Sequence, residues 1–197
     1  MSIETANIFF SVLSLAAGAL AIAIAGAALL ARSSPDGTAA LLLDEIRPLA
    51  LWGACAVAAT ATLGSLYYSE VEGLLPCEYC WYQRIAMYPL ALILGIAAVR
   101  GDTSIRRYAI PVAGIGMAVS LYHYQLEWFP DQGSSCSALV PCTARYFEQF
   151  GFVSLAFMAL TGFAAIIALL AVAGSPAGRP DVTDSPATDR LPEDQPA

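Results

Sequence analysis

The chain has 197 residues, of which 58% are hydrophobic and only 13% are charged. Because soluble domains carry roughly a quarter charged residues, this composition excludes an ordinary soluble domain. Much of the formal net charge of −7 lies in the last stretch of the chain, so it says little about the core. All nine basic residues are arginine and they form no basic patch, so no nucleic-acid partner is expected.

Five apolar segments follow one another, at residues 8–31, 49–68, 77–99, 108–126 and 150–173. A helix needs about 20 apolar residues to cross the ~30 Å hydrocarbon core of a bilayer. We therefore predict an all-α membrane protein: an antiparallel four-helix transmembrane bundle plus one extra N-terminal transmembrane helix. The predicted organisation is the extra helix with a cytoplasmic linker over 1–43, the four-helix core over 44–173, and a disordered acidic cytoplasmic tail over 174–197.

The distribution of arginines predicts the orientation, because cytoplasmic loops are enriched in positive charge. With the N-terminus outside, only Arg84 and Arg145 fall on the outer side. The cytoplasmic side then holds Arg32, Arg47, Arg100, Arg106, Arg107, Arg179 and Arg190. The first apolar segment is preceded by Glu4 and by no arginine, and it is longer than the apolar part of a signal peptide, so we interpret it as a true span.

Two cysteines, Cys77 and Cys80, stand at the start of the third segment, directly after Pro76. Proline favours a first helical position, so the helix is predicted to begin here. The positive end of the helix dipole stabilises a thiolate, and a Cys-x-x-Cys pair at such a place is typical of redox-active thiols. Arg84 follows Cys80 by four residues on the same helix face. It is interpreted as stabilising a Cys80 thiolate or binding a quinone carbonyl oxygen, with snorkelling to the headgroups as the alternative.

A second pair, Cys136 and Cys142, lies in the outer loop between the last two segments. There, Cys136 could reach an incoming protein or the first pair, and the alternative is a purely structural disulfide. Five residues separate the two cysteines, a spacing that does not suit a four-thiolate zinc site, so no metal is predicted. Cys55, inside the second segment, is interpreted as a packing residue.

His123, the only histidine, falls near the outer end of the fourth segment. Between two tyrosines it fits an interfacial hydrogen-bonding residue, whereas beside a reducible ring it could deliver a proton.

Together these motifs resemble the DsbB family of quinone-dependent disulfide-generating membrane proteins. The resemblance rests on Leu75-Pro76-Cys77-x-x-Cys80-x-x-Gln83-Arg84, then on His123-x-x-Leu126-x-x-x-Pro130 and the later cysteine pair. It covers about residues 49–173, and the short spacing of the second pair is similar to the BdbC-type branch.

The resemblance implies a thiol oxidase in the bacterial cytoplasmic (inner) membrane that reoxidises a soluble thioredoxin-like, DsbA-type protein on the outer face. Electrons would pass to a membrane quinone, ubiquinone or menaquinone, supporting disulfide formation in exported proteins. In this scheme Cys80 faces the quinone with Cys77 as its partner, and Arg84, Gln83 and His123 belong to the quinone site. Cys136 forms the mixed disulfide with the soluble protein and Cys142 resolves it, although the short spacing leaves their order open.

The alternative function is a polytopic membrane scaffold or transporter subunit whose outer cysteines form structural disulfides. The two readings differ in one observable, since only redox-active pairs change their alkylation state with quinone supply. The apolar segments also lack buried Asp, Glu or Lys, which argues against an ion transporter.

Overall fold

The computed structural model describes residues 2–132, 136 and 140–174, and these form helices joined by short connections. The five long helices are α1 (Ile3–Ser33), α2 (Thr38–Leu66), α3 (Glu78–Arg100), α4 (Arg106–Trp128) and α5 (Leu155–Ala173). A π-helical turn, Tyr67–Val71, continues α2, and the short 3₁₀ helices Thr103–Ile105 and Pro130–Gln132 flank α4. No β-strand is formed by the described part of the chain. The segment predicted as an acidic tail lies outside the described residues, apart from Gly174.

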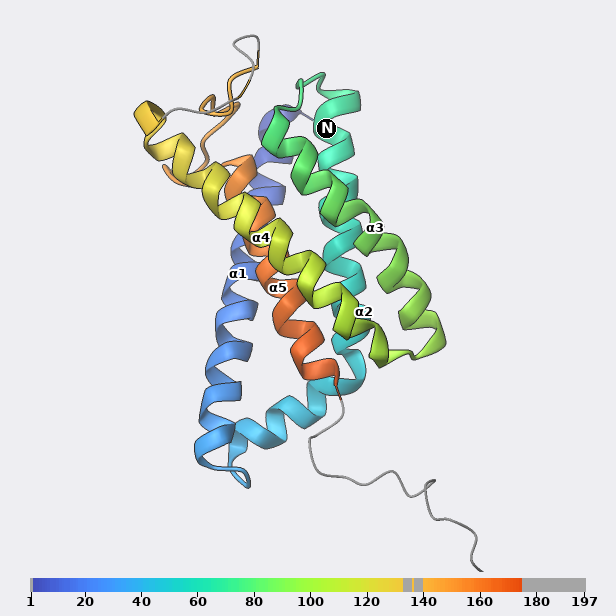
Figure 1. The fold of residues 1–197 in the computed structure, drawn as a ribbon. Coiled ribbons are helices and arrows are strands. Elements are labelled where there is room, and N and C mark those ends of the chain that lie inside the picture. The colour runs from blue at the N-terminus through green and yellow to red at the C-terminus, as the bar shows by residue number, and fades with distance from the viewer. Residues whose placement is uncertain (1, 133–135, 137–139, 175–197) are drawn as a thin grey trace, which may run out of the picture.

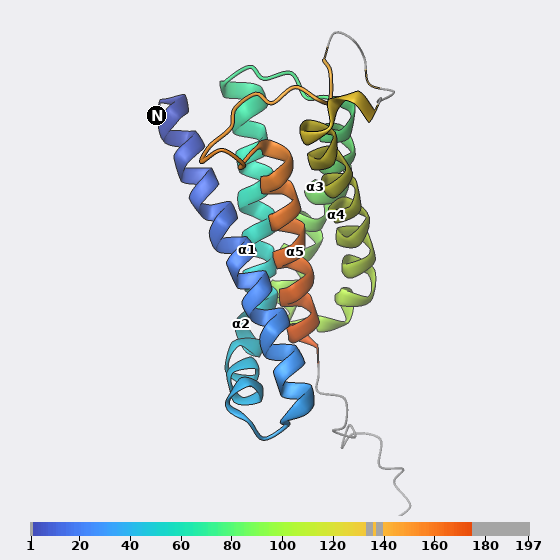
Figure 2. The same ribbon diagram turned by 90° about the vertical axis from the view of Figure 1, so that its left-hand side faces the viewer.

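The long helices run up and down in one bundle (Figure 1). Helices α2 to α5 form its four-helix part, and α1 packs against the outside of α5 and α2 (Figure 2). By length and composition, α1, α2 with its π-helical end, α3 and α5 could each cross a membrane. Helix α4 is as long as α3, with 23 residues, but it is less apolar and is not among these four. The predicted all-α membrane fold class is confirmed.

The beginning of α2 differs from the sequence prediction. The helix starts at Thr38 and not near residue 49, so the charged stretch before the apolar segment is itself helical. Pro48 lies inside this helix and cannot donate a backbone hydrogen bond, which explains the angle between the first turns of α2 and the rest (Figure 1). Arg47 donates to the Val172 carbonyl oxygen at 3.3 Å and so ties the bend to the end of α5. The predicted boundary at residue 43 therefore falls within α2.

The core lies between α2, α3, α4 and α5, where Leu90, Leu94, Phe163 and Ile166 are buried. Helices α4 and α5 approach closely because Gly116 leaves room for the ring of Phe163. A Cβ atom on Gly116 would lie 2.3 Å from the ring, so only glycine fits this contact.

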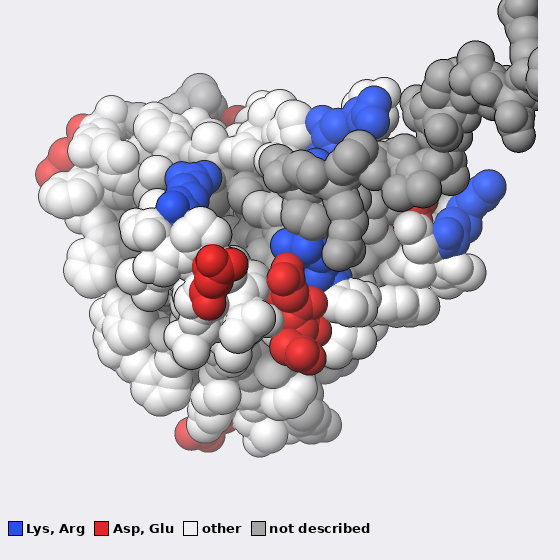
Figure 3. Space-filling view, turned by 90° about the horizontal axis from the view of Figure 1, so that it is seen from below, with Lys and Arg blue, Asp and Glu red and all other residues white. Residues whose placement is uncertain are grey.

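The two ends of the bundle differ in charge. Arg32 ends α1, Arg100 ends α3, and Arg106 begins α4, so these arginines share one end. Figure 3 looks at this end and shows arginine and acidic side chains scattered among uncharged residues, with some of the two kinds next to each other. The cysteine pairs, at the start of α3 and after the end of α4, lie at the opposite end.

Candidate functional site

The first cysteine pair is built around the start of α3. Cys77 is the N-cap residue, and its sulfur accepts a hydrogen bond from the Cys80 backbone N–H at 3.3 Å. The helix begins at Glu78, so Pro76 precedes the cap and is not the first helical residue as predicted. The two sulfur atoms lie 2.6 Å apart, so a small movement closes a disulfide. The pair thus sits at the positive end of a long helix, where a thiolate is stabilised.

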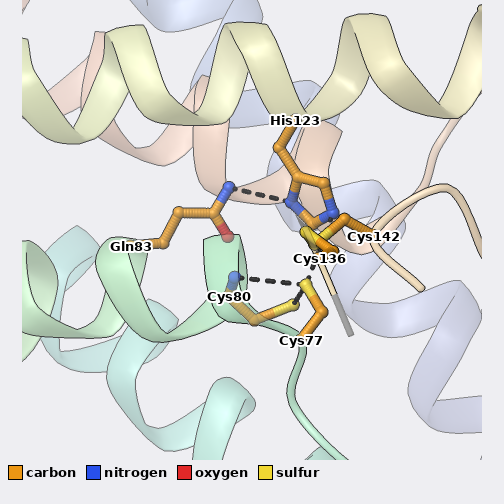
Figure 4. The surroundings of a disulfide bond; sticks show 6 residues. All are labelled: Cys77, Cys80, Gln83, His123, Cys136 and Cys142. Carbon is orange, nitrogen blue, oxygen red and sulfur yellow. Dashed lines mark hydrogen bonds between the residues drawn. A yellow bond between two sulfur atoms is a disulfide. The ribbon is translucent and has the colours of Figure 1, made fainter. Parts of the chain in front are cut away.

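His123 on α4 reaches the same pair. Its Nε2 lies 3.6 Å from the Cys77 sulfur and its Nδ1 lies 3.4 Å from Nε2 of Gln83, all among buried side chains (Figure 4). The hydrogen bond from Cys80 lowers the pKa of the Cys77 thiol most strongly; burial opposes this shift, and His123 lowers the pKa further. Cys77 is therefore the thiol of the pair that is held ready as a thiolate.

A cavity of about 400 Å³ lies on the Cys80 side of the pair. Its walls come from α1, α2, α3 and α5 and are mostly apolar, and Cys80, Gln83 and Arg84 face it from α3. Its volume falls within the usual range of sites for small organic molecules. His123 is not among the lining residues, so the structure places it beside Cys77 and away from the cavity.

Arg84 is fixed at the edge of this cavity by α2. Its Nε donates to Ser65 Oγ at 3.0 Å and its NH2 to the Ser65 carbonyl oxygen at 3.1 Å. The Tyr88 hydroxyl donates to Ser65 Oγ at 3.2 Å, and the Arg84 guanidinium lies 5.4 Å from the centre of the Trp81 ring. The side chain is thus anchored within the protein and presents a fixed positive charge to an apolar cavity.

The second pair forms a disulfide, Cys136–Cys142, with a Cα–Cα distance of 6.0 Å. Cys142 has no exposed surface, whereas Cys136 is partly exposed. Figure 4 shows this disulfide in the surroundings of Cys77 and His123. The structure therefore brings together the four cysteines that the sequence singled out.

The segment after Cys142 is attached at two points. Tyr146 donates a hydrogen bond to the Leu75 carbonyl oxygen, just before the first pair, and also lines the cavity. Burial raises the pKa of Tyr146, and negative charge on Cys80 and Cys77 acts in the same direction, so its hydroxyl stays a donor. Arg145 lies over the Trp128 ring at 4.4 Å and donates to the Glu127 carbonyl oxygen at 2.8 Å. These contacts hold the second pair close to the first.

The sequence did not reveal Ser65 or Tyr146 as parts of the site. Ser65 is one of several small polar residues in an apolar segment, and Tyr146 is one of nine tyrosines. Cys55 is partly buried and packs against the core, with its sulfur 3.7 Å from the Cβ position of Gly95, as a packing residue would.

The ligand atoms of Cys77, Cys80 and His123 all lie within 4.8 Å of one another, close enough to bind one metal ion. Two thiolates on one tetrahedral Zn²⁺ at about 2.3 Å would lie about 3.8 Å apart. The observed 2.6 Å between the sulfurs is much shorter and suits thiol–disulfide chemistry better.

A transmembrane helical bundle with a Cys-x-x-Cys pair capping one helix, and a second disulfide beside it, defines a membrane protein of thiol–disulfide exchange. Comparison with known proteins agrees, since residues 47–174 match the model of the family described as disulfide bond formation protein DsbB. The chain belongs to the DsbB family, and it is a multi-pass membrane oxidoreductase that generates disulfides.

Similar proteins point to one branch of this family. Disulfide bond formation protein C of Bacillus subtilis is 47% identical over 119 residues, which cover 59% of this chain and 86% of the relative. Probable disulfide formation protein C 1 of Bacillus cereus is 50% identical over 118 residues, covering 58% and 82%. These relatives support the BdbC-type assignment. No solved structure gave a significant match.

Proposed function

We propose that the protein reoxidises a soluble thioredoxin-like, DsbA-type protein on the outer face of the bacterial cytoplasmic membrane and passes the electrons to a membrane quinone. The observation that carries this proposal is the position of the Cys77–Cys80 pair between two different surroundings. Cys80 faces an apolar cavity with Arg84 at its edge, whereas Cys77 contacts His123 near the second disulfide. One pair can thus exchange electrons with a protein disulfide and with an apolar acceptor.

The cavity fits a quinone ring by its chemistry. Arg84 supplies a fixed positive charge for a ring oxygen, Gln83 supplies an amide, and the remaining walls are mainly apolar. Ubiquinone and menaquinone both carry such a ring and an apolar chain. When bound, the quinone accepts two electrons and two protons and leaves as the quinol.

The first exchange takes place at the second pair. A thiolate of the soluble partner attacks Cys136, the more exposed residue of the pair, so the Cys136–Cys142 bond breaks and Cys142 leaves as a thiolate. The second thiolate of the partner then attacks the mixed disulfide. The partner becomes oxidised, and Cys136 and Cys142 are both reduced.

The second exchange returns the loop pair to its disulfide. A thiolate of the reduced loop pair attacks the Cys77–Cys80 disulfide, and the remaining loop thiol closes the Cys136–Cys142 bond. Cys77 and Cys80 now hold the two electrons. Oxidation of this pair by the quinone would re-form the Cys77–Cys80 bond. The two electrons would leave on the Cys80 side, toward the cavity, and two protons would complete the quinol, with His123 within hydrogen-bond distance of Cys77. The net reaction is partner dithiol plus quinone to partner disulfide plus quinol.

The deciding experiment measures quinone reduction by the purified protein, supplied with a reduced thioredoxin-like dithiol protein. Wild type and Cys55→Ala should reduce the quinone, because Cys55 packs against the core, and Cys80→Ala should not. Folded wild type that reduces neither ubiquinone nor menaquinone would instead favour a scaffold or transporter subunit with structural disulfides. In that case the alkylation state of both pairs would also not follow quinone supply.

A further inference from the structure

Helix α1 lies outside the part of the chain that matches the DsbB family, which begins at residue 47. It nevertheless contributes to the cavity next to Cys80. Its six lining residues are Phe10, Leu13, Ser14, Ala16, Ala17 and Leu20, and their spacing places them along one face of the helix.

The position of α1 is fixed by close contacts on both neighbouring helices. The ring of Phe10 lies against Gly64 of α2, where a Cβ would come within 2.9 Å of it. Tyr68 donates to Asn7 Oδ1 at 2.9 Å, which ties the outer end of α1 to the end of α2. Gly18 lies against Thr161 of α5, where a Cβ atom on the glycine would come within 3.2 Å of the Thr161 methyl group. These contacts hold the cavity-lining face of α1 in place as a wall.

The wall is long and apolar. From Phe10 to Leu20 the helix rises about 15 Å, roughly half of the ~30 Å hydrocarbon core. The deep end of the cavity carries apolar side chains from three helices, Leu20, Val57 and Phe163, whereas Arg84 and Cys80 stand nearer its outer end. Ser14, the polar residue of the α1 wall, donates to the Ser11 carbonyl oxygen and leaves no free donor for a ligand.

We propose that α1 forms a binding wall for the isoprenoid chain of the quinone, so that this additional helix sets the affinity for the quinone tail and not the chemistry at the ring. The proposal rests on the function proposed above. A ring at Cys80 and Arg84 would carry its apolar chain down the cavity, along Leu13, Ala17 and Leu20. A helix in this place replaces mobile lipid by a fixed surface, against which a chain of repeated units can pack.

The test compares two acceptors with the same ring, 2,3-dimethoxy-5-methyl-1,4-benzoquinone without a side chain and the same quinone bearing a decyl chain. Ala17→Phe fills the middle of the wall and Leu20→Ala removes contact at its deep end. Ile22→Phe is the matched control, because Ile22 lies on α1, is 76% exposed and does not line the cavity. Protein in lipid nanodiscs is assayed with a reduced thioredoxin-like dithiol protein.

Ala17→Phe and Leu20→Ala should each raise KM for the decyl quinone about ten-fold, the usual effect of changing a hydrophobic pocket. KM for the ring without a chain, and kcat for both acceptors, should stay within about two-fold of wild type, as should every value for Ile22→Phe. Leu20→Ala adds no bulk, so its KM values decide the test if Ala17→Phe does not fold. If a variant changed KM equally for both acceptors, or for neither, the proposed role of α1 would be overturned and the proposed function would stand. Wild type that reduces neither acceptor would overturn the proposed function together with this inference.

Discussion

The sulfur of Cys77 lies 3.6 Å from Nε2 of His123, so a residue at the start of α3 is paired with one near the end of α4. The other ring nitrogen of His123 lies 3.4 Å from Nε2 of Gln83, nearly two turns further along α3. The imidazole is therefore held between two positions of the same helix and has one orientation toward the thiol.

The first prediction concerns the reactivity of Cys77. The thiolate is the reactive form, and its hydrogen bonds lower the pKa of Cys77, so reduced wild type should alkylate at a pH below that of a free thiol. Removing one of these hydrogen bonds raises the pKa. In His123→Ala the midpoint of Cys77 alkylation should therefore move upward by about one pH unit. Peptide mapping of the alkylated cysteine against pH measures it, and an unmoved midpoint would contradict the pairing.

The second prediction concerns Arg84. Arg84→Lys keeps the charge but loses the two-point attachment to Ser65, so the charge should no longer be fixed at the cavity edge. KM for the quinone should rise about ten-fold, a loss of about 1.4 kcal/mol. Arg107→Lys, at the opposite end of the bundle, is the matched control. Equal KM values for the two variants would show that the Ser65 attachment has no part in binding.

A third prediction concerns packing between α4 and α5. Gly116→Ala places a methyl group where the Phe163 ring lies, and overpacking of this kind costs about 1–3 kcal/mol. Gly114→Ala, in the same helix with no atom within 4 Å of the new methyl group, should leave stability unchanged or raise it slightly. Thermal unfolding in detergent compares them. A Gly116→Ala protein as stable as Gly114→Ala would mean that α5 shifts without cost.

A fourth prediction concerns metal. Although Cys77, Cys80 and His123 could together hold an ion, we expect purified protein to contain no stoichiometric zinc and to keep its activity in a chelator. Elemental analysis by mass spectrometry and quinone reduction with and without EDTA measure this. One zinc per chain, lost together with activity, would assign the three residues to a metal site.

The sequence was informative where its signal is local. The apolar segments predicted the helices, and the Cys-x-x-Cys pair at a helix start predicted the thiol site, because both depend on residues close together in the chain. Arg84 could be placed on the face of Cys80 from spacing alone. Its anchor at Ser65 could not, because that contact depends on how α2 and α3 pack and joins residues 19 positions apart.

Two other features could not be predicted for physical reasons. The charged residues around Arg47 precede the apolar segment, so hydropathy alone did not include them in the second helix, yet α2 runs through them and Arg47 contacts Val172 of α5. The role of α1 as a cavity wall was also hidden. A helix that is apolar on every side shows no periodicity to indicate which face meets protein and which meets lipid.

The unequal burial of the second disulfide gives the proposed relay a direction. Cys136 is partly exposed and Cys142 is fully buried, so a thiolate that approaches from outside has better access to Cys136 than to Cys142. In the proposed relay, Cys142 would then leave as a thiolate in the surroundings of Cys77 (Figure 4). Small oxidants and stray thiols in bulk solvent have little access to that sulfur. In the proposed relay, this unequal burial would favour attack by the partner at Cys136 and would limit the return of electrons through Cys142.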